Sequence, residues 1–153
     1  DCPGFMIGLE AEKSATIRHG VRAMAAVNQS TVPWCTIIVR NAFGVAGVVH
    51  QPANRYSMRY AWPSGYWGSL PLEGGIEAAY RAEIDAASDP EAKLVEIETR
   101  LNRLRSPFRT AETFWVEEII DPRDRRPLLC DWVETAYRLL PEEIGRKARG
   151  MRP

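Results

Sequence analysis

The segment from residue 40 to residue 49, Arg-Asn-Ala-Phe-Gly-Val-Ala-Gly-Val-Val, has the composition of an oxyanion-binding turn. Gly44 and Gly47 allow the backbone to turn sharply and to approach a ligand closely. The segment directly follows the apolar, β-branched run at residues 34–39, so it is predicted to connect a buried strand to a helix. Unpaired backbone N–H groups at such a junction can stabilise a developing negative charge. The same glycines would also be present if they served only turn geometry and close packing.

A second loop of this kind lies at residues 3–8, directly before a predicted helix at residues 10–28. If the two loops meet in space, they present two sets of N–H groups and two positive helix ends to one small volume. Such a volume would suit an enolate or an anionic leaving group.

The composition is that of an ordinary domain. The chain has 153 residues and is 45% hydrophobic, which is enough for a core, so residues 1–153 are predicted to form a single domain. Its 20 basic and 20 acidic residues give a net charge of zero, so no bulk attraction to nucleic acid or membrane is expected. No apolar run approaches the roughly 20 residues that span a bilayer, and we expect a soluble, cytoplasmic protein.

The cysteines indicate neither a disulfide framework nor a metal site. Cys2, Cys35 and Cys130 are an odd number without C-x-x-C spacing, and no histidines cluster near them. We therefore expect three reduced thiols in the core and no bound metal.

Conventional acid–base candidates are few. His19 and His50 are interpreted as hydrogen-bonded structural residues. Glu117 and Glu118 are adjacent on a predicted strand, so their side chains should face opposite ways and cannot act together on one substrate atom. The sequence therefore favours catalysis by backbone groups.

Helical and strand patterns alternate along the chain, which predicts an α/β fold with its ligand loops at one end of a sheet. The aromatic segment at residues 51–66 is predicted to roof a cavity or to line an interface, and the basic tail at residues 141–153 to be solvated. The expected elements are a helix at 10–28, a strand at 34–39, a helix beginning at Gly74–Gly75, a helix at 90–104 that Asp89 caps, a strand at 115–120, and a helix from about Pro127 that Pro141 stops.

These residues resemble, in order and nearly without gaps, the carboxyl-terminal half of the carboxyltransferase (beta) subunit of biotin-dependent acyl-CoA carboxylases. No single piece is decisive, but several pieces at consistent spacing are specific. The matching runs are Asp1 to Gly8, Glu12, Ile17 to Gly20, Thr31 to Pro33, Arg40 to Ala46, Ala61 to Pro63, Gly74 to Arg81, Ser106 to Phe108, Ala111-Glu112 and Val116 to Asp124.

The resemblance implies a crotonase-like α/β fold that lacks its first strands, since the chain opens without methionine as if in mid-fold. It implies transfer of a carboxyl group from carboxybiotin to the α-carbon of an acyl-CoA, with biotin attached to a carrier protein and not to this chain. The expected partners are the amino-terminal half of the same subunit, a biotin carboxyl carrier protein, a biotin carboxylase and further copies in a homo-oligomer.

The resemblance also implies the site residues. The backbone amides of Val45 and Ala46 would hold an oxyanion, which we expect to be the ureido carbonyl of biotin. Val48 would line the acyl pocket, and because some relatives have an acidic residue there, this valine favours a bulkier or branched acyl group. The implied biotin-binding residues are Gly4, Phe5, Phe43 and Gly44.

Two other functions stay open at this point. One is a crotonase-like hydratase, isomerase or hydrolase that acts on acyl-CoA alone, which would need a carboxylate beside the oxyanion loop, and none lies within several residues of Gly44. The other is a non-catalytic assembly subunit. The isolated chain is predicted to be inactive, since half of a shared cleft would be missing.

Overall fold

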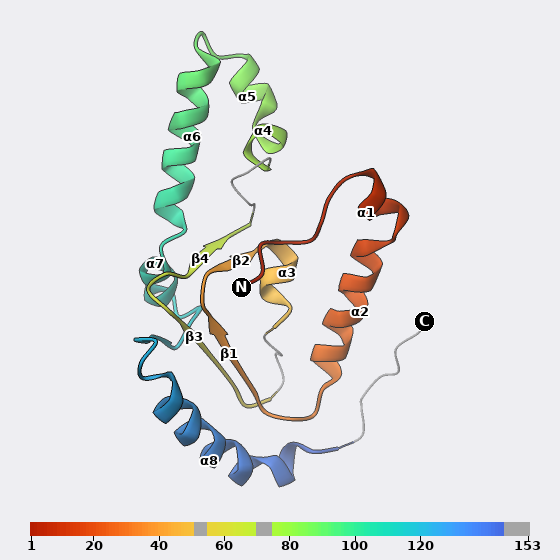
Figure 1. Ribbon diagram of the computed structural model, residues 1–153, viewed down its shortest axis with the longest axis vertical. Coiled ribbons are helices and arrows are strands. Elements are labelled where there is room, and N and C mark those ends of the chain that lie inside the picture. The colour runs from red at the N-terminus through yellow and green to blue at the C-terminus, as the bar shows by residue number, and fades with distance from the viewer. Residues whose placement is uncertain (51–54, 70–74, 146–153) are drawn as a thin grey trace.

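A computed structural model of the chain describes residues 1–50, 55–69 and 75–145 (Figure 1). Its helices are α1 (Leu9–Lys13), α2 (Thr16–Gln29), α3 (Gly44–Val48), α4 (Gly75–Ala79), α5 (Arg81–Asp85), α6 (Pro90–Leu104), α7 (Pro107–Glu112) and α8 (Arg125–Glu143). Its strands are β1 (Trp34–Ile38), β2 (Asn41–Phe43), β3 (Ser57–Ala61), β4 (Tyr66–Gly68) and β5 (Glu118–Ile119).

Two small parallel sheets form the centre of the molecule. In one sheet the strand order is β1-β3-β5, and in the other β2 pairs with β4. Every one of these pairs is parallel, with Trp34 opposite Ser57 and Ala42 opposite Trp67. Parallel strands joined through helices confirm the predicted α/β class.

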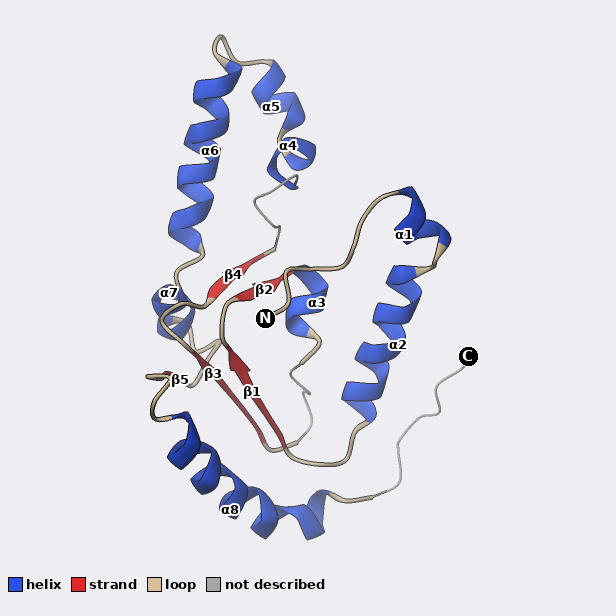
Figure 2. Cartoon of the chain, in the orientation of Figure 1, coloured by secondary structure: helices blue, strands red, loops and turns tan. Residues whose placement is uncertain are grey.

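The helices surround this centre and project away from it (Figure 2). The helix α6 runs back beside α4 and α5, α2 lies on the other side beyond α3, and α8 passes below the strands (Figure 1). A cluster of buried side chains, Ile38, Ala42, Ala61 and Val116, joins the two sheets. The turn between β2 and α3 therefore begins next to this buried cluster, because β2 contributes Ala42 to it.

The structure confirms the helix predicted at residues 90–104, which is α6. The Asp89 side chain accepts a hydrogen bond of 3.0 Å from the Ala92 N–H, and Pro90 is in the first turn. The carboxylate satisfies one of the N–H groups that a helix start leaves unpaired.

The helix predicted at residues 10–28 is wrong as one element, because it is broken into α1 and α2. Ala15 between them has a φ of +56°, and the Ser14 hydroxyl donates to the Ala11 carbonyl at 2.9 Å. Serine side chains compete in this way with helical hydrogen bonding. The apolar stripe of α2 is also half exposed, since Ile17 and Val21 keep 52% and 53% of their surface.

The prediction that the aromatic segment at residues 51–66 roofs a cavity is wrong for its central part, which is a strand of the sheet. Residues 57–61 form β3, the middle strand of the larger sheet, and Tyr60 and Ala61 are buried. The sequence of this strand does not alternate between apolar and polar residues, because both of its faces are covered and one buried position is an arginine, Arg59. Residues 51–54 lie outside the described part.

Other boundaries moved by less. The helix after Gly75 is interrupted at Tyr80, the strand predicted at 115–120 is reduced to Glu118–Ile119, and α8 continues past Pro141 to Glu143. The short helix α7 was not predicted, although Pro107 at its start is a known signal. Residues 70–74 and the tail at 146–153 lie outside the described residues. Among the described helices, none combines the length and apolar character that crossing a bilayer requires.

Candidate functional site

The turn from β2 into α3 has the geometry that its glycines predict. Gly44 has a φ of +58°, in the left-handed region that favours glycine. Gly47 is buried, and a Cβ added to it would lie 2.5 Å from the Ala42 carbonyl carbon. The backbone of α3 therefore packs directly on that of β2, where no side chain fits between them.

The N–H groups of Val45 and Ala46 lie in the first turn of α3. A helix leaves its first N–H groups without partners of its own. Among the described residues, no hydrogen bond has the Val45 or Ala46 N–H as its donor. Within the described structure, both N–H groups therefore lack an internal acceptor.

A cavity of about 620 Å³ opens beside this turn. Its walls are mostly apolar and aromatic, and Arg109 adds one positively charged side chain to them. The lining residues are Ala42, Gly44, Val45, Gly47, Val48, Trp67, Gly68, Ser69, Leu104, Arg109, Thr110, Thr113 and Trp115. Gly44, Val45 and Val48, all singled out from the sequence, thus share one cavity, whereas Ala46 is only 3% exposed and is not among these lining residues.

The first loop starts beside the second. The Cys2 N–H donates to the Asn41 carbonyl at 2.6 Å, and the Phe43 N–H donates to the Cys2 carbonyl at 3.0 Å. Cys2 therefore adds to the edge of β2, just before the turn. The chain then leaves, and the Phe5 ring packs onto α2 at Gly20. Neither Gly4 nor Phe5 is among the lining residues of the 620 Å³ cavity.

Phe43 is only 5% exposed, and the Arg105 guanidinium lies 4.7 Å from the centre of its ring. This cation–π contact occupies a face of the ring. Burial lowers the pKa of Arg105. The Phe43 ring is therefore largely covered, and its N–H is already bonded to the Cys2 carbonyl.

Sequence reasoning missed several residues in or behind the cavity wall, among them Trp67, Arg59 and Arg109. Trp67 lines the cavity, and the buried Arg59 stacks on it with its guanidinium carbon 4.6 Å from the ring centre. Arg109 was passed over because the helix that carries it, α7, was not predicted. A lone arginine inside a β-like run, such as Arg59 in residues 57–61, is the signal that could have indicated a buried cation.

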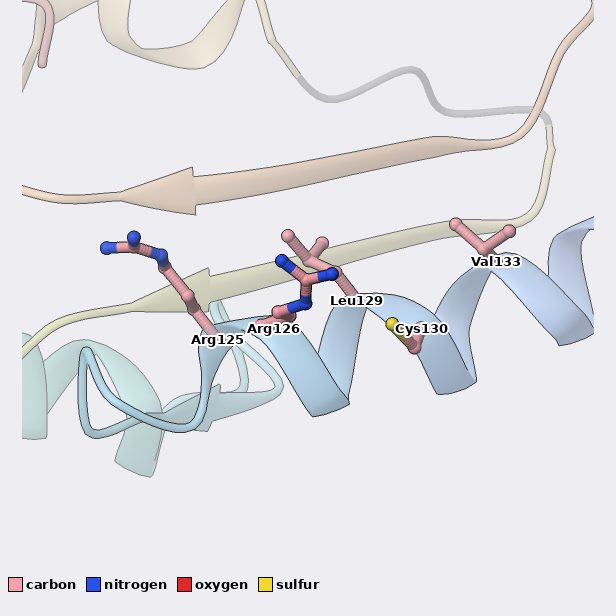
Figure 3. Close-up of a pocket in the computed structure, with 5 residues that line it drawn as sticks. All are labelled: Arg125, Arg126, Leu129, Cys130 and Val133. Carbon is pink, nitrogen blue, oxygen red and sulfur yellow. The ribbon is translucent and has the colours of Figure 1, made fainter.

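A second hollow of about 510 Å³ lies along α8 (Figure 3). All of its lining residues come from this one helix, and they are Arg125, Arg126, Leu129, Cys130 and Val133. None of the site residues that the sequence predicted lines this hollow. Among the described residues, no group of three or more histidine, cysteine or acidic side chains is placed to hold a metal ion.

Comparison with known proteins decides the family. The sequence model of the carboxyl transferase domain family matches residues 1–149. The chain belongs to this family. The domain is 36% identical over 138 residues to the methylmalonyl-CoA carboxyltransferase 12S subunit of Propionibacterium freudenreichii subsp. shermanii, a match that covers 88% of the chain and 26% of that protein. It is 34% identical over 130 residues to the propionyl-CoA carboxylase carboxyltransferase subunit of Haloferax mediterranei, covering 82% of the chain and 25% of that protein.

Solved structures agree. The transcarboxylase 12S structure, a hexamer with methylmalonyl-CoA and methylmalonic acid bound, has a TM-score of 0.72 at 30% identity and matches 100% of the chain and 29% of its own. The beta subunit of geranyl-CoA carboxylase from P. aeruginosa, at 21% identity and a TM-score of 0.81, supports the fold alone and matches 98% of the chain and 29% of its own. The predicted family and crotonase-like fold are therefore confirmed. The carboxyl transferase domain described here spans about a quarter of the length of the curated relatives it matches.

Proposed function

We propose that this chain is the part of a biotin-dependent acyl-CoA carboxyltransferase that presents the backbone N–H groups of the β2–α3 turn to a reacting oxygen. One observation carries the proposal. The Val45 N–H has no acceptor among the described residues, and Val45 lines the cavity of about 620 Å³. An N–H that is fixed beforehand at the wall of a cavity stabilises negative charge without reorganisation.

The chemistry is the transfer of a carboxyl group from carboxybiotin to the α-carbon of an acyl-CoA. The bond between the biotin nitrogen and the carboxyl carbon breaks, an α C–H bond breaks and a carbon–carbon bond forms, while the α-proton passes to the biotin nitrogen. The described walls of the cavity include no carboxylate and no histidine. They supply hydrogen-bond donors and apolar surfaces. The task of these walls is then to position two substrates and to stabilise the oxygens that gain charge, which can account for a large part of a rate enhancement.

The residues present fit a cyclic urea such as the biotin head group. A ureido carbonyl needs an N–H donor, which Val45 offers, and a flat ring packs well against aromatic walls such as Trp67 and Trp115. We assign the ureido carbonyl to the amides of Val45 and Ala46. The proposed biotin contacts come from both loops and are Gly4, Phe5, Phe43 and Gly44.

Val48 is the proposed wall of the acyl pocket. The residue is 49% exposed and lines the same cavity. An apolar branched side chain at this position favours acyl groups that bring apolar carbon atoms to it, because burying an added methylene stabilises a complex by about 0.8 kcal/mol. We therefore expect a preference for acyl-CoA substrates larger than acetyl-CoA.

The partners follow from the same proposal. The chain would work with the amino-terminal half of its subunit, a biotin carboxyl carrier protein and a biotin carboxylase, in a cytoplasmic homo-oligomer. Large apolar side chains on α1 and α2 support contact with other chains, because Leu9, Ile17 and Val21 are each more than half exposed. Such surfaces typically mark interfaces.

An acceptor screen tests the function. The biotinylated carrier is first carboxylated by biotin carboxylase with ATP and labelled bicarbonate. It is then mixed with the complete subunit and offered acetyl-, propionyl- and branched acyl-CoA. We expect label in a carboxylated acyl-CoA, fastest for the larger acyl groups, and no turnover by the isolated chain. Val45→Ala is the control, since it keeps the backbone N–H and should retain most activity. Hydrolysis or hydration of acyl-CoA without any carboxyl transfer would contradict the proposal.

A further inference from the structure

Arg59 occupies an unusual position for an arginine. It lies on β3 in the middle of the larger sheet, and its residue surface is only 1% exposed. Arginine is almost never fully buried unless its charge is paired, because removing a charge from water costs several kcal/mol. Burial lowers the pKa of Arg59, and the Glu117 carboxylate opposes this shift.

The contacts of Arg59 lead to both sides of the cavity. Its Nη2 donates a hydrogen bond of 2.9 Å to the Gly47 carbonyl in α3. The flat face of the same guanidinium stacks on Trp67, a cavity wall on β4. The Glu117 carboxylate accepts a hydrogen bond from the Arg59 N–H, and the Glu117 N–H donates to the Arg59 carbonyl at 2.8 Å. The strand that carries Arg59 is thus itself held in place.

The helix α3 needs such an anchor. It has only five residues. Isolated helices shorter than about 12 residues are marginal in water, because they form too few internal hydrogen bonds to offset nucleation. The orientation of α3, and with it the direction of the Val45 N–H, must therefore come from tertiary contacts. The described ones include the packing of Gly47 on Ala42 and the hydrogen bond from Arg59.

We propose that Arg59 is a positioning residue for the carboxyl-transfer site, because one guanidinium fixes α3 and Trp67 relative to each other and so aims the Val45 N–H into the cavity. Arg59 is not among the residues that line this cavity, and it acts through the two walls. This inference rests on the proposed function for its catalytic consequence. Its structural part, the fixing of α3, stands on the contacts alone.

Two substitutions in the assembled enzyme test the proposal. Arg59→Met removes the hydrogen bond and the charge, and Arg59→Lys keeps the charge without the planar fork that bonds and stacks at once. Since misplacement of reacting groups by about 1 Å can cost on the order of 10²-fold, we expect kcat to fall about 10- to 100-fold in both variants, with the KM for acyl-CoA within about threefold. Arg100→Met, on α6, is the matched control. The Arg100 guanidinium also lies over an aromatic ring, 5.7 Å from the centre of Tyr80, but Arg100 does not line this cavity.

Hydrogen–deuterium exchange of the substrate-free protein is the second readout. In Arg59→Met we expect the hydrogen-bonded amides among residues 44–49, such as that of Val49, which donates to the Val45 carbonyl, to exchange about tenfold faster than in the wild type. Residues 90–104 should be unchanged, as local opening predicts. This exchange measurement does not depend on carboxyl-transfer activity. If the wild type transfers no carboxyl group, the proposed function fails, and exchange alone decides whether Arg59 holds α3.

The positioning role is overturned if exchange at residues 44–49 stays at the wild-type rate, or if all segments accelerate together, which would mean general destabilisation. It is also overturned if α3 opens while kcat is unchanged. Should Arg59→Met fail to fold, the same criteria are applied to Arg59→Lys.

Discussion

A Cβ atom on Gly47 would lie 2.5 Å from the carbonyl carbon of Ala42, so α3 and β2 meet backbone to backbone. Real Cβ contacts are essentially never this short. Both partners are main chain, so neither can rotate away as a side chain would. The distance between the turn and its supporting strand is therefore set by the absence of a side chain at Gly47.

Gly47→Ala should displace α3. Forcing a methyl group into a well-packed contact typically costs 1–3 kcal/mol, and we expect that loss in the free energy of unfolding together with a lower transfer rate. Urea denaturation and the acceptor assay measure the two effects. Gly145→Ala is the matched control, since a Cβ there meets nothing within 4 Å. Equal stability of both variants would refute the close contact.

Gly44 presents a different constraint. A Cβ there would lie 3.5 Å from the Ser69 carbonyl oxygen, an ordinary contact, so its φ of +58° is what limits substitution. Left-handed conformations cost most residues about 1–2 kcal/mol, and asparagine tolerates them better. Thermal denaturation should rank stability as Gly44→Asn above Gly44→Ala above Gly44→Val. A reversed order would show that space, not φ, sets the limit.

Gly20 holds the ring of Phe5. An added Cβ would overlap the ring edge, which sits on α2 at this glycine. Gly20→Ala should therefore push the Phe5 ring away from α2, raising the KM for the carboxylated carrier more than it lowers the melting temperature. Phe5→Leu shortens the side chain, so the double variant should regain part of the loss, as coupled neighbours do. Additive effects of the two substitutions would argue against contact.

The Cys35 thiol should resist alkylation. Burial, with a smaller contribution from Glu117, raises its pKa from 9.0 to about 11. The thiolate is the reactive form, so at pH 8 iodoacetamide should modify the exposed Cys130 well before Cys35, as mass spectrometry of timed samples would show. The unfolded chain ionises this thiol first as pH rises past 9, so its contribution to stability is intact below pH 9 and is lost towards about pH 11. Equal labelling rates at pH 8 would contradict the shift.

The sequence predicted well what depends on local backbone chemistry. The cap at Asp89, the strand β1 and the positive φ of Gly44 follow from residue types and their immediate neighbours. The prediction that all three cysteines lie in the core was wrong, because Cys130 is exposed on α8 and Cys2 and Cys35 are only half-buried. Helical spacing alone does not say which face another element will cover.

Tertiary contacts explain the larger misses. β3 could not be predicted because its inward residue, Arg59, is polar and is stabilised by partners distant in the chain, Gly47 and Trp67. The cavity combines β2, α3, β4 and α7, whose side chains meet only after folding. The turn at Gly44 was recognised from its composition, whereas its walls required the fold.

The most direct test removes single N–H groups from the turn. Replacing Val45, or separately Ala46, by the corresponding α-hydroxy acid turns its amide into an ester and deletes one donor while the side chain stays. Losing one oxyanion donor typically costs on the order of 10²–10³ in rate, so carboxyl transfer by the complete subunit should fall by that factor for at least one position. Wild-type transfer rates with both esters would show that these nitrogens hold no reacting oxygen.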